Sequence, residues 1–282
     1  MSARDTVWIS AAEVARRLDA GEPLTLLDVR WQLGQPDGRA AYEQGHLPGA
    51  VYVSLEDELS DHTVEGRGRH PLPSGTALES AARRWGVRAG VPIVVYDDWN
   101  RAGSARAWWV LTAAGIDDVR ILDGGLAAWM AVGRQLESGV VEPAPGNVTV
   151  AHDDLYDGAR PTVIADALLE PGRLVLDARA PERFRGDVEP VDPVAGHIPG
   201  ALNVPSTRLL TEDGALLDDD ELARALGDVG DGDVAVYCGS GVTAAVTIAG
   251  LAAAGVNAAL FPGSWSQWSS DPSRPVARGS RP

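Results

Sequence analysis

Lysine is absent from this 282-residue sequence, and all 24 of its basic residues are arginine. Without a lysine amine, Schiff-base chemistry on the protein is excluded, whereas arginine offers planar, bidentate contacts to carboxylate-like anions. Acidic residues outnumber basic ones and give a formal net charge of −16. This balance argues against nucleic acid and anionic membranes as partners, and an anionic substrate would need positive potential built locally.

Cysteine is almost as scarce, because Cys238 is the only one in the chain. A single cysteine excludes an intramolecular disulfide, and with only five histidines it argues against a structural zinc site. We therefore expect no metal and no cofactor. Residues 1–5 lack the apolar core of a signal peptide, and no apolar run is long enough to span a bilayer. The sequence therefore predicts a cytoplasmic protein with no membrane partner.

The surroundings of Cys238 predict a strand, a tight loop and a helix. Residues 234–237 form an apolar run that suits a buried strand. Gly239 and Gly241 allow a sharp turn that exposes backbone N–H groups, and residues 242–254 are apolar and alanine-rich. A thiol at such a junction faces amide donors and the positive end of a helix dipole, which favour the reactive thiolate. We therefore interpret Cys238 as a nucleophile rather than as a small buried hydrophobic residue.

The two halves of the chain repeat the same motifs in the same order. Residues 26–30, 45–50, 93–97 and 122–125 match residues 175–179, 196–201, 234–238 and 261–264, respectively. Ordered matches of this kind indicate a duplicated domain with insertions in its loops. Each half alternates short apolar strands with helical stretches. The pattern predicts an α/β fold of two tandem domains, each a mainly parallel sheet flanked by helices.

These matches also set the expected domain boundaries. We expect an N-terminal domain over residues 1–139, a linker over 140–155 and a C-terminal domain over 156–282. The linker assignment rests on a segment rich in proline and glycine.

Some of the repeated residues are expected to be structural. The motif Gly-His-(Leu or Ile)-Pro-Gly-Ala occurs once in each half and contains His46 and His197. A histidine inside such a turn is well placed to bond to the backbone, so we expect neither to be catalytic. Trp129 and Trp268, which occupy matching positions, are expected to anchor the core.

The motifs resemble those of sulfurtransferases with two tandem rhodanese-like domains, over nearly the whole chain. The resemblance rests on the paired Gly-His motifs, the paired Leu-Asp-x-Arg strands and the loop Cys-Gly-Ser-Gly-Val-Thr-Ala at residues 238–244. In this family the N-terminal domain is catalytically silent, which fits Asp97 standing where the second half has Cys238. The resemblance therefore implies an enzyme whose C-terminal domain is catalytic.

Within the family, the residues after the cysteine separate two kinds of sulfur donor. Thiosulfate-using members typically have Arg and Lys there, whereas this chain has the neutral Gly239 and Ser240. The loop is similar to that of 3-mercaptopyruvate sulfurtransferases, and a neutral loop should bind a dianion poorly. A thiosulfate:cyanide sulfurtransferase and a persulfide carrier are the alternatives. A phosphatase of this fold needs Cys-x5-Arg, and that position holds Ala244.

The resemblance implies two half-reactions centred on Cys238. Its thiolate takes the sulfur of 3-mercaptopyruvate, leaving pyruvate and a persulfide, and an acceptor thiol or cyanide then removes the outer sulfur. Thioredoxin is one candidate thiol acceptor. Backbone amides of the loop, from Gly239 through Gly241 and Val242 to Thr243, are expected to hold the negative charge.

The resemblance also implies a polar relay from the first domain. Asp61 is expected to orient His70, and His70 to polarise Ser240, which would assist the substrate carbonyl or the leaving enolate. The loop before His70 departs from the family pattern, so His62 is a rival for the same position. The structural alternative is that His70 is an exposed loop histidine.

Arginines are expected to bind the carboxylate of the donor. Arg179 matches a substrate-binding arginine of the family, although a structural ion pair with Asp177 is the alternative. Arg183 and Arg185 are further candidates, and a solvated surface charge is the alternative for Arg185.

Two residues of the first half are assigned to the cleft between the domains. Arg106 matches a family arginine there, and it is expected either to hold a carboxylate or to pack on an indole as a cation–π contact. Trp31 is expected to cover the persulfide.

Overall fold

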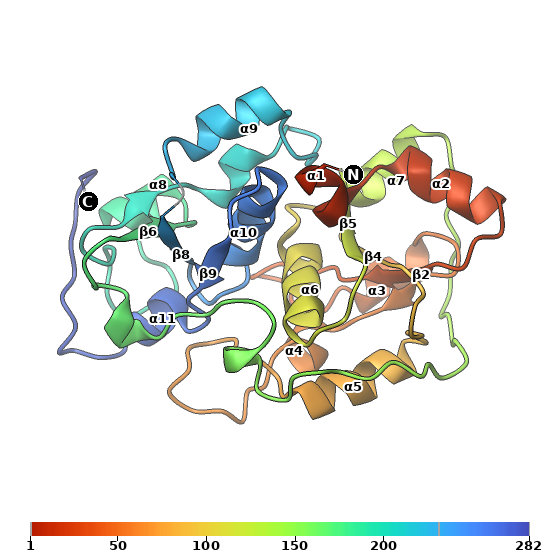
Figure 1. The fold of residues 1–282 in the computed structure, drawn as a ribbon, viewed down its shortest axis with the longest axis horizontal. Helices are drawn as coiled ribbons and strands as arrows, with labels where there is room; N and C mark the ends of the chain where they lie inside the picture. The colour runs from red at the N-terminus through yellow and green to blue at the C-terminus, as the bar shows by residue number, and fades with distance from the viewer. Residues whose placement is uncertain (1, 231, 282) are drawn as a thin grey trace.

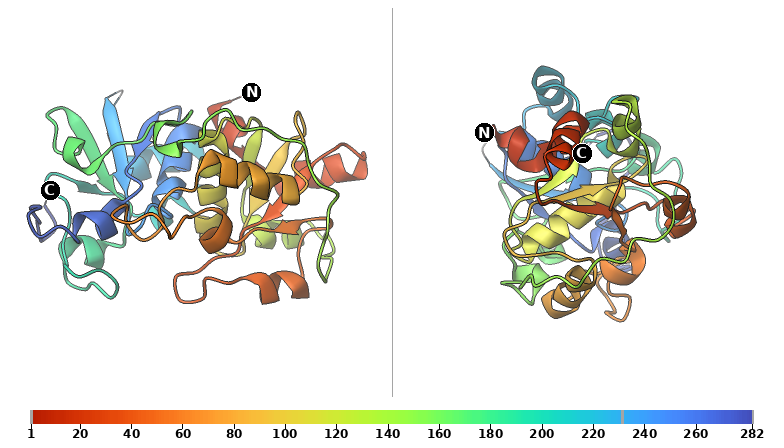
Figure 2. Two further views of the ribbon diagram at one scale, coloured as in Figure 1. Left: turned by 90° about the horizontal axis from the view of Figure 1, so that it is seen from below. Right: turned by 90° about the vertical axis from the view of Figure 1, so that its right-hand side faces the viewer.

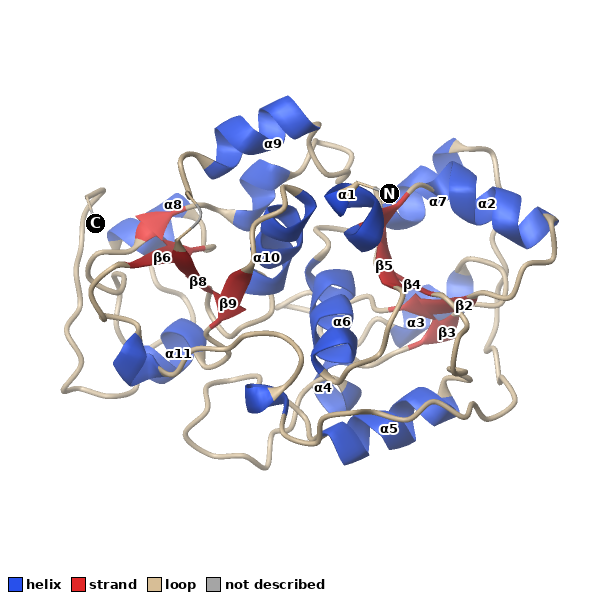
Figure 3. Cartoon of the chain, in the orientation of Figure 1, coloured by secondary structure: helices blue, strands red, loops and turns tan. Residues whose placement is uncertain are grey.

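Two parallel sheets, one in each half of the chain, organise the molecule (Figures 1 and 2). The structure, a computed structural model, describes residues 2–230 and 232–281. Helices pack around both sheets, so the expected α/β class with two tandem domains is confirmed (Figure 3). Within the described residues, no helix is both long and apolar enough to cross a membrane.

The first sheet has five strands in the order β1-β5-β4-β2-β3, and every neighbouring pair is parallel. Its central strand β4 is a buried, β-branched run, as a strand covered on both faces requires. The strands are β1 (Trp8–Ile9), β2 (Thr25–Asp28), β3 (Val51–Tyr52), β4 (Ile93–Tyr96) and β5 (Val119–Leu122). The helices of this half are α1 (Ala3–Val7), α2 (Ala11–Asp19), α3 (Arg39–Gln44), α4 (Leu55–Glu58), α5 (Gly75–Arg84), α6 (Ala102–Ala113) and α7 (Gly125–Ala131).

The second sheet has four parallel strands in the order β7-β6-β8-β9. Its strands are β6 (Arg173–Asp177), β7 (Leu202–Asn203), β8 (Asp233–Tyr237) and β9 (Ala258–Leu260). The α-helices are α8 (Pro181–Arg185), α9 (Asp219–Leu226), α10 (Ala244–Ala253) and α11 (Ser264–Trp268). Three short 3₁₀ turns complete this half: η1 (Leu155–Asp157), η2 (Ala165–Ala167) and η3 (Ser206–Leu209).

Helices α6 and α10 join the two halves. They pack against each other in the middle of the molecule, between the two sheets (Figure 1). Nearly every residue of both helices is buried, which explains why neither shows the polar stripe of a surface helix. Trp8 adds a contact across the interface, because its Nε1 donates to the carbonyl oxygen of Ala249 at 3.3 Å. A single hydrophobic cluster therefore runs from one half into the other.

The segment between α7 and β6 lies along the first half of the molecule. Gly146 N–H donates to the carbonyl of Arg83 at 2.7 Å, and Asn147 N–H donates to that of Val87 at 3.0 Å. Val148 of this segment is buried. The proline-rich stretch is thus bound to the first half by backbone hydrogen bonds, and it carries the chain to the second half along a defined path.

The two histidines of the repeated turns are buried, and each contacts the backbone. The ring nitrogens of His46 lie 2.9 Å and 3.2 Å from the carbonyl oxygens of Leu47 and Gly139. Nδ1 of His197 lies 2.8 Å from the carbonyl of Phe184, and its ring stacks on that phenyl ring. These contacts agree with a structural role for both histidines. The core positions expected for Trp129 and Trp268 are confirmed, since both are buried.

Candidate active site

Cys238 lies directly after β8, in the loop that leads into α10. This arrangement agrees with the strand–loop–helix predicted from the local sequence. The Cys238 Sγ accepts a hydrogen bond from Gly241 N–H at 3.2 Å. Its own N–H donates to Ser264 Oγ at 3.1 Å. The thiol is 1% exposed, so the reacting atom is held by the loop and shielded from bulk water.

Gly241 is required by the path of the loop. Its φ of +80° is one that a side chain rarely adopts, and an added Cβ would lie 2.4 Å from the carbonyl oxygen of Pro262. The loop can therefore bend tightly enough to point the Gly241 N–H at Cys238. The other expected loop residues contribute differently: Val242 packs into the core, and Thr243 precedes the first residue of α10. In the described structure the amide of Gly241 is the one that reaches the sulfur.

His70 of the first half reaches Ser240 of the catalytic loop. Nδ1 of His70 and Oγ of Ser240 are 2.7 Å apart, and both residues are buried. On the other side of the ring, Nε2 lies 3.1 Å from Oε1 of Glu56. A carboxylate can only accept, so Nε2 carries a hydrogen and donates to Glu56. In the neutral ring Nδ1 is then the acceptor, and the Ser240 hydroxyl donates to it.

The electrostatics of this chain favour a neutral imidazole beside an ionised carboxylate. Burial lowers the pKa of His70 below its ordinary value of 6.5, although Glu56 pulls it in the opposite direction. The hydrogen bond from His70 lowers the pKa of Glu56 to about 2, and a second one from the Trp31 indole at 2.6 Å acts in the same direction. At neutral pH, Ser240 therefore faces an uncharged proton acceptor that is backed by a negative charge.

Glu56, and not Asp61, contacts the ring of His70, which corrects the expected partner. The Asp61 carboxylate accepts from the N–H and hydroxyl of Thr63 in its own turn, at 3.0 Å and 2.6 Å. His62, the expected rival, lies 3.0 Å from the second oxygen of Glu56 and is about half exposed, with its side chain at 49%. The short Asp61 side chain is held by its local turn, whereas the longer Glu56 projects from α4 toward the ring.

Trp31 packs against His70. The two rings meet edge to face with centroids 5.6 Å apart, while the indole N–H donates to Glu56. The expectation that Trp31 covers a persulfide stays a prediction. The indole and Glu56 together hold the imidazole in one orientation.

Arg106 is not available to a substrate, which corrects the expectation that it holds a carboxylate. Its side chain is fully buried and donates to the carbonyl oxygens of Leu59, His70 and Pro71 at 3.0–3.4 Å, and to that of Gly241 at 3.3 Å. Those carbonyls belong to the segment that carries His70 and to the catalytic loop. Arg106 therefore ties the two halves of the site together.

Arg179 forms the structural ion pair with Asp177 that was the alternative to substrate binding. Its side chain is 1% exposed, pairs with Asp177 at 2.6 Å and with Glu189 at 3.4 Å, and lies over the ring of Trp265. These contacts leave it buried beneath the site instead of in contact with a ligand. Arg185 pairs with Asp187 at the surface, in agreement with its reading as a solvated charge.

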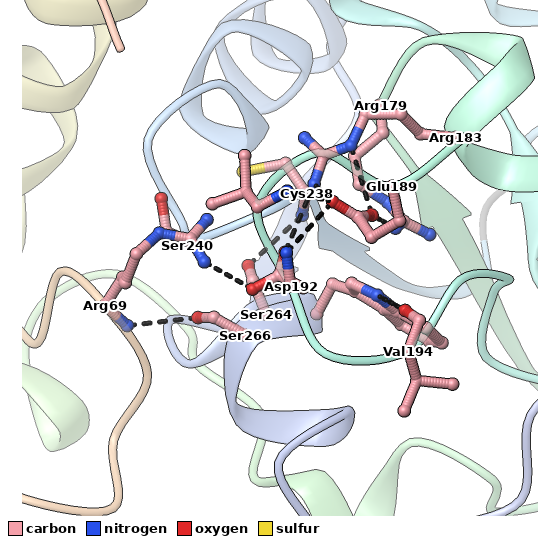
Figure 4. A network of polar contacts seen from close by, with 12 residues as sticks. Arg69, Arg179, Arg183, Glu189, Asp192, Val194, Cys238, Ser240, Ser264 and Ser266 are labelled. Atoms are coloured by element: carbon pink, nitrogen blue, oxygen red, sulfur yellow. Dashed lines mark hydrogen bonds and ion pairs between the residues drawn. The ribbon is translucent and has the colours of Figure 1, made fainter. Parts of the chain in front are cut away.

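Arg183 and Arg69 both lie against Gly239 of the loop after Cys238. A Cβ added to Gly239 would be 3.4 Å from Nη1 of Arg183 and 3.3 Å from Nη2 of Arg69. Both guanidinium groups also bind Asp192, whose side chain is 2% exposed, and Figure 4 shows this carboxylate among the arginines. Of the arginines expected to bind substrate, Arg183 is thus the one whose guanidinium lies against Gly239, the residue after Cys238.

Asp97 fills the equivalent loop of the first half with its own carboxylate. One oxygen accepts from the N–H groups of Trp99 and Arg101, and the other accepts from the N–H and hydroxyl of Ser104. The Arg101 side chain adds an ion pair at 2.9 Å, and both partners are buried. The loop thus holds a built-in anion and has no nucleophile.

Sequence reasoning missed Glu56 and Arg69. Glu56 lies on a helix of four residues whose first turn contains three acidic residues, so no local pattern distinguishes it from Asp57 and Glu58. Arg69 stands directly before His70, and that adjacency was the available signal for a second cation at the site. Its contact with Asp192 crosses 123 residues of sequence and could not be read locally.

Comparison with known proteins gives matches over both halves of the chain. The sequence profile of the Rhodanese-like domain matches residues 10–132 and 162–271. "Putative thiosulfate sulfurtransferase SseB" of Mycobacterium tuberculosis is 65% identical over 282 residues and is covered, like this chain, to 99%.

Two solved structures extend the comparison to the fold. SseA from Escherichia coli, described as a 3-mercaptopyruvate sulfotransferase, is 38% identical, with a TM-score of 0.79 over 93% of this chain and 99% of its own. A 3-mercaptopyruvate sulfurtransferase from Leishmania major is 30% identical, with a TM-score of 0.81 over 94% of this chain and 74% of its own. The relatives therefore carry two different donor names.

Proposed function

The chain belongs to the rhodanese-like sulfurtransferase family, and on that premise we propose that it transfers sulfur from 3-mercaptopyruvate to a thiol or cyanide acceptor through a persulfide on Cys238. The buried contact between His70 and Ser240 carries this proposal. In this contact an imidazole nitrogen that can accept a proton lies against the hydroxyl of Ser240, two residues after Cys238.

The first half-reaction forms the persulfide. The Cys238 thiolate attacks the donor sulfur and makes a new S–S bond, while the donor C–S bond breaks and its electron pair passes into the enolate of pyruvate. The thiol proton of the donor is transferred to the enolate carbon. The products are pyruvate and an ionised Cys238 persulfide, so charge and atoms balance. The Gly241 N–H at the Cys238 sulfur stabilises the thiolate that makes this attack.

Ser240 and His70 provide the route for that proton. The Ser240 hydroxyl donates to Nδ1 of the neutral His70, so its oxygen offers free lone pairs to a donor S–H. Ser240 takes the thiol proton as its own passes to His70, and the imidazolium formed is stabilised by Glu56. The same chain returns the proton to the enolate. Thiosulfate carries no proton to move, so this relay favours a donor with a thiol.

The charge around the loop supports the same donor. Arg183 and Arg69 approach Gly239, but Asp192 and Glu189 already pair with them. At a site with little net positive charge, binding a monocarboxylate costs less electrostatic free energy than binding a dianion. This argument favours 3-mercaptopyruvate over thiosulfate, the donor named for the Mycobacterium tuberculosis relative.

In the second half-reaction an acceptor thiolate attacks the outer sulfur and regenerates the Cys238 thiolate. Cyanide serves as an artificial acceptor in the same way, and thioredoxin is a candidate protein thiol. The first half-reaction leaves the enzyme as a persulfide, and the second starts from that form after pyruvate has left. The kinetics should therefore be ping-pong.

The division of labour between the halves is part of the proposal. Residues 1–139 form a domain that donates Glu56 and His70 but no nucleophile, because Asp97 occupies its loop. Residues 140–155 link it to the catalytic domain over residues 156–282. The silent domain is required because it completes the proton relay of the other.

Steady-state sulfur transfer to cyanide tests the proposal. 3-Mercaptopyruvate and thiosulfate are compared side by side with the wild type and with Cys238→Ser, and pyruvate is measured alongside thiocyanate. We expect a strong preference for 3-mercaptopyruvate that is abolished in Cys238→Ser. A preference for thiosulfate would overturn the donor assignment. No turnover of either donor, with Cys238 still receiving a persulfide from a desulfurase, would instead identify a carrier.

A further inference from the structure

Asp192 occupies a central position among the charges beside the catalytic loop. Its carboxylate pairs with Arg69 and, at 3.1 Å, with Nη2 of Arg183. Its N–H also donates to Glu189 Oε1 at 3.1 Å, which fixes its backbone. The side chain is 2% exposed, so these contacts are shielded from water.

Arg69 brings a cation from the first half of the chain to this place. Its N–H donates to Ser266 Oγ at 3.0 Å, and the preceding Gly68 has a φ of +84° where an added Cβ would lie 2.4 Å from the Gly263 carbonyl (Figure 4). The segment is thus pressed against α11, and the guanidinium is directed to Asp192 and Gly239.

Both guanidinium groups keep an N–H end for a ligand. In the described part of the chain, no group accepts a hydrogen bond from Nη2 of Arg69 or from Nη1 of Arg183. These are the same two nitrogens that approach Gly239. In 3-mercaptopyruvate the carboxylate is three bonds from the sulfur, so a donor bound at Cys238 places its anionic group close to Gly239.

The charges of this cluster cancel. Three guanidinium groups face three carboxylates, and the carboxylates are buried, which limits screening by solvent. The hydrogen bond from Arg183 and the N–H of Asp192 hold the pKa of Glu189 below its ordinary value against the opposing effect of burial, so Glu189 is a full negative charge. An incoming anion therefore meets cations that are already neutralised.

We infer that Asp192 is a specificity-determining residue, whose carboxylate competes with the donor's anionic group for Arg69 and Arg183 and so selects against donors of higher negative charge. The inference rests on the proposed function and refines the site of that reaction. Of the paired acids, Glu189 also binds the structural Arg179, whereas the ion pairs of the Asp192 carboxylate with described residues are those with Arg69 and Arg183. Neutralising Asp192 should therefore change the binding of an anionic ligand without removing an ion pair of the structural Arg179.

The substitution Asp192→Asn tests this inference because it removes one negative charge at nearly constant shape. The free energy gained by a ligand scales with its charge, so a dianion should gain the square of the factor gained by a monoanion. The probes are methanesulfonate and sulfate, two tetrahedral anions that differ in charge, as inhibitors competitive with whichever donor turns over. We expect the inhibition constant to fall about fivefold for methanesulfonate and about twenty-five-fold for sulfate.

Asp187→Asn is the matched control. It also removes one negative charge from the segment between α8 and β7, but Asp187 belongs to an exposed ion pair with Arg185. Equal factors for the two anions in Asp192→Asn, or no change, would overturn the inference. If Asp192→Asn does not fold, Arg69→Gln should show the opposite sign, with sulfate inhibition weakened more than methanesulfonate inhibition. Donor preference of the wild type is measured separately, so failure of the proposed function and failure of this inference give different results.

Discussion

Nδ1 of His70 lies 2.7 Å from Oγ of Ser240, although the two residues are 170 positions apart in the sequence. His70 belongs to a loop of the first domain, and Ser240 lies two residues after Cys238 in the second. Because both are buried, the contact exists only when the domains are docked through α6 and α10. The active site is therefore a property of the pair of domains.

Ser240→Ala should lower kcat/KM for 3-mercaptopyruvate by about a hundredfold, the usual size of a lost proton-transfer group. The effect on thiosulfate should be less than fivefold, because that donor carries no proton. Thiocyanate formation with each donor measures the difference. Ser270→Ala, at an exposed position, is the matched control. An equal loss with both donors would show that Ser240 shapes the loop and moves no proton.

Glu56→Gln and Asp61→Asn should behave differently, although both neutralise a carboxylate in the same part of the first domain. Glu56 accepts from His70 at 3.1 Å, whereas Asp61 binds Thr63 in its own turn. We expect kcat for 3-mercaptopyruvate to fall about tenfold or more in Glu56→Gln and to stay within twofold of the wild type in Asp61→Asn. The reverse order would restore Asp61 as the residue that orients His70.

The pH dependence of kcat/KM should report the protonation state of His70. Burial lowers its pKa below 6.5, so the neutral, active form is present above that value and is lost as the pH falls through the lowered pKa. Removing the Glu56 charge takes away a group that raises this pKa. The acidic limb of the profile should therefore move to lower pH in Glu56→Gln. A shift to higher pH would contradict this assignment.

Arg106→Met should destabilise the fold. The buried guanidinium donates to four backbone carbonyls, and its loss removes this donor from those of Leu59, His70 and Gly241, whereas Pro71 keeps the N–H of Asp61. We expect a cost of about 3–5 kcal/mol in the free energy of unfolding. Urea unfolding measures this change. Arg88→Met, at an exposed position, should cost less than about 0.5 kcal/mol. A stable Arg106→Met that binds donors weakly would return Arg106 to the role of a substrate ligand.

Asp97→Asn should separate stability from catalysis. The carboxylate accepts four hydrogen bonds within its loop and pairs with the buried Arg101, so neutralising it should cost about 3 kcal/mol. The specific activity of the folded fraction should remain within twofold of the wild type, because the loop holds no nucleophile. Thermal unfolding and active-site titration of Cys238 by alkylation measure the two effects. A large loss of activity in fully folded protein would contradict a silent first loop.

The sequence by itself determined the fold class, the tandem repeat and the candidate nucleophile. Each of these follows from short-range pattern: a buried β-branched run, two glycines and an apolar helix surround Cys238 within about twenty residues. The structural histidines His46 and His197 were predictable for the same reason, since a Pro/Gly turn holds them against nearby backbone.

The tertiary structure alone decided which polar groups meet at the site. The contact of Glu56 with His70 and the ion pairs of Arg179 depend on packing within one half of the chain. The contact of Arg106 with Gly241 and that of Arg69 with Asp192 depend on how the two halves dock. An arginine or a carboxylate has similar local preferences whether it binds a substrate, a backbone carbonyl or an internal counter-charge. Its role depends on burial and on its partners, and those are set only when the chain folds and, for Arg106 and Arg69, when the two domains pack together.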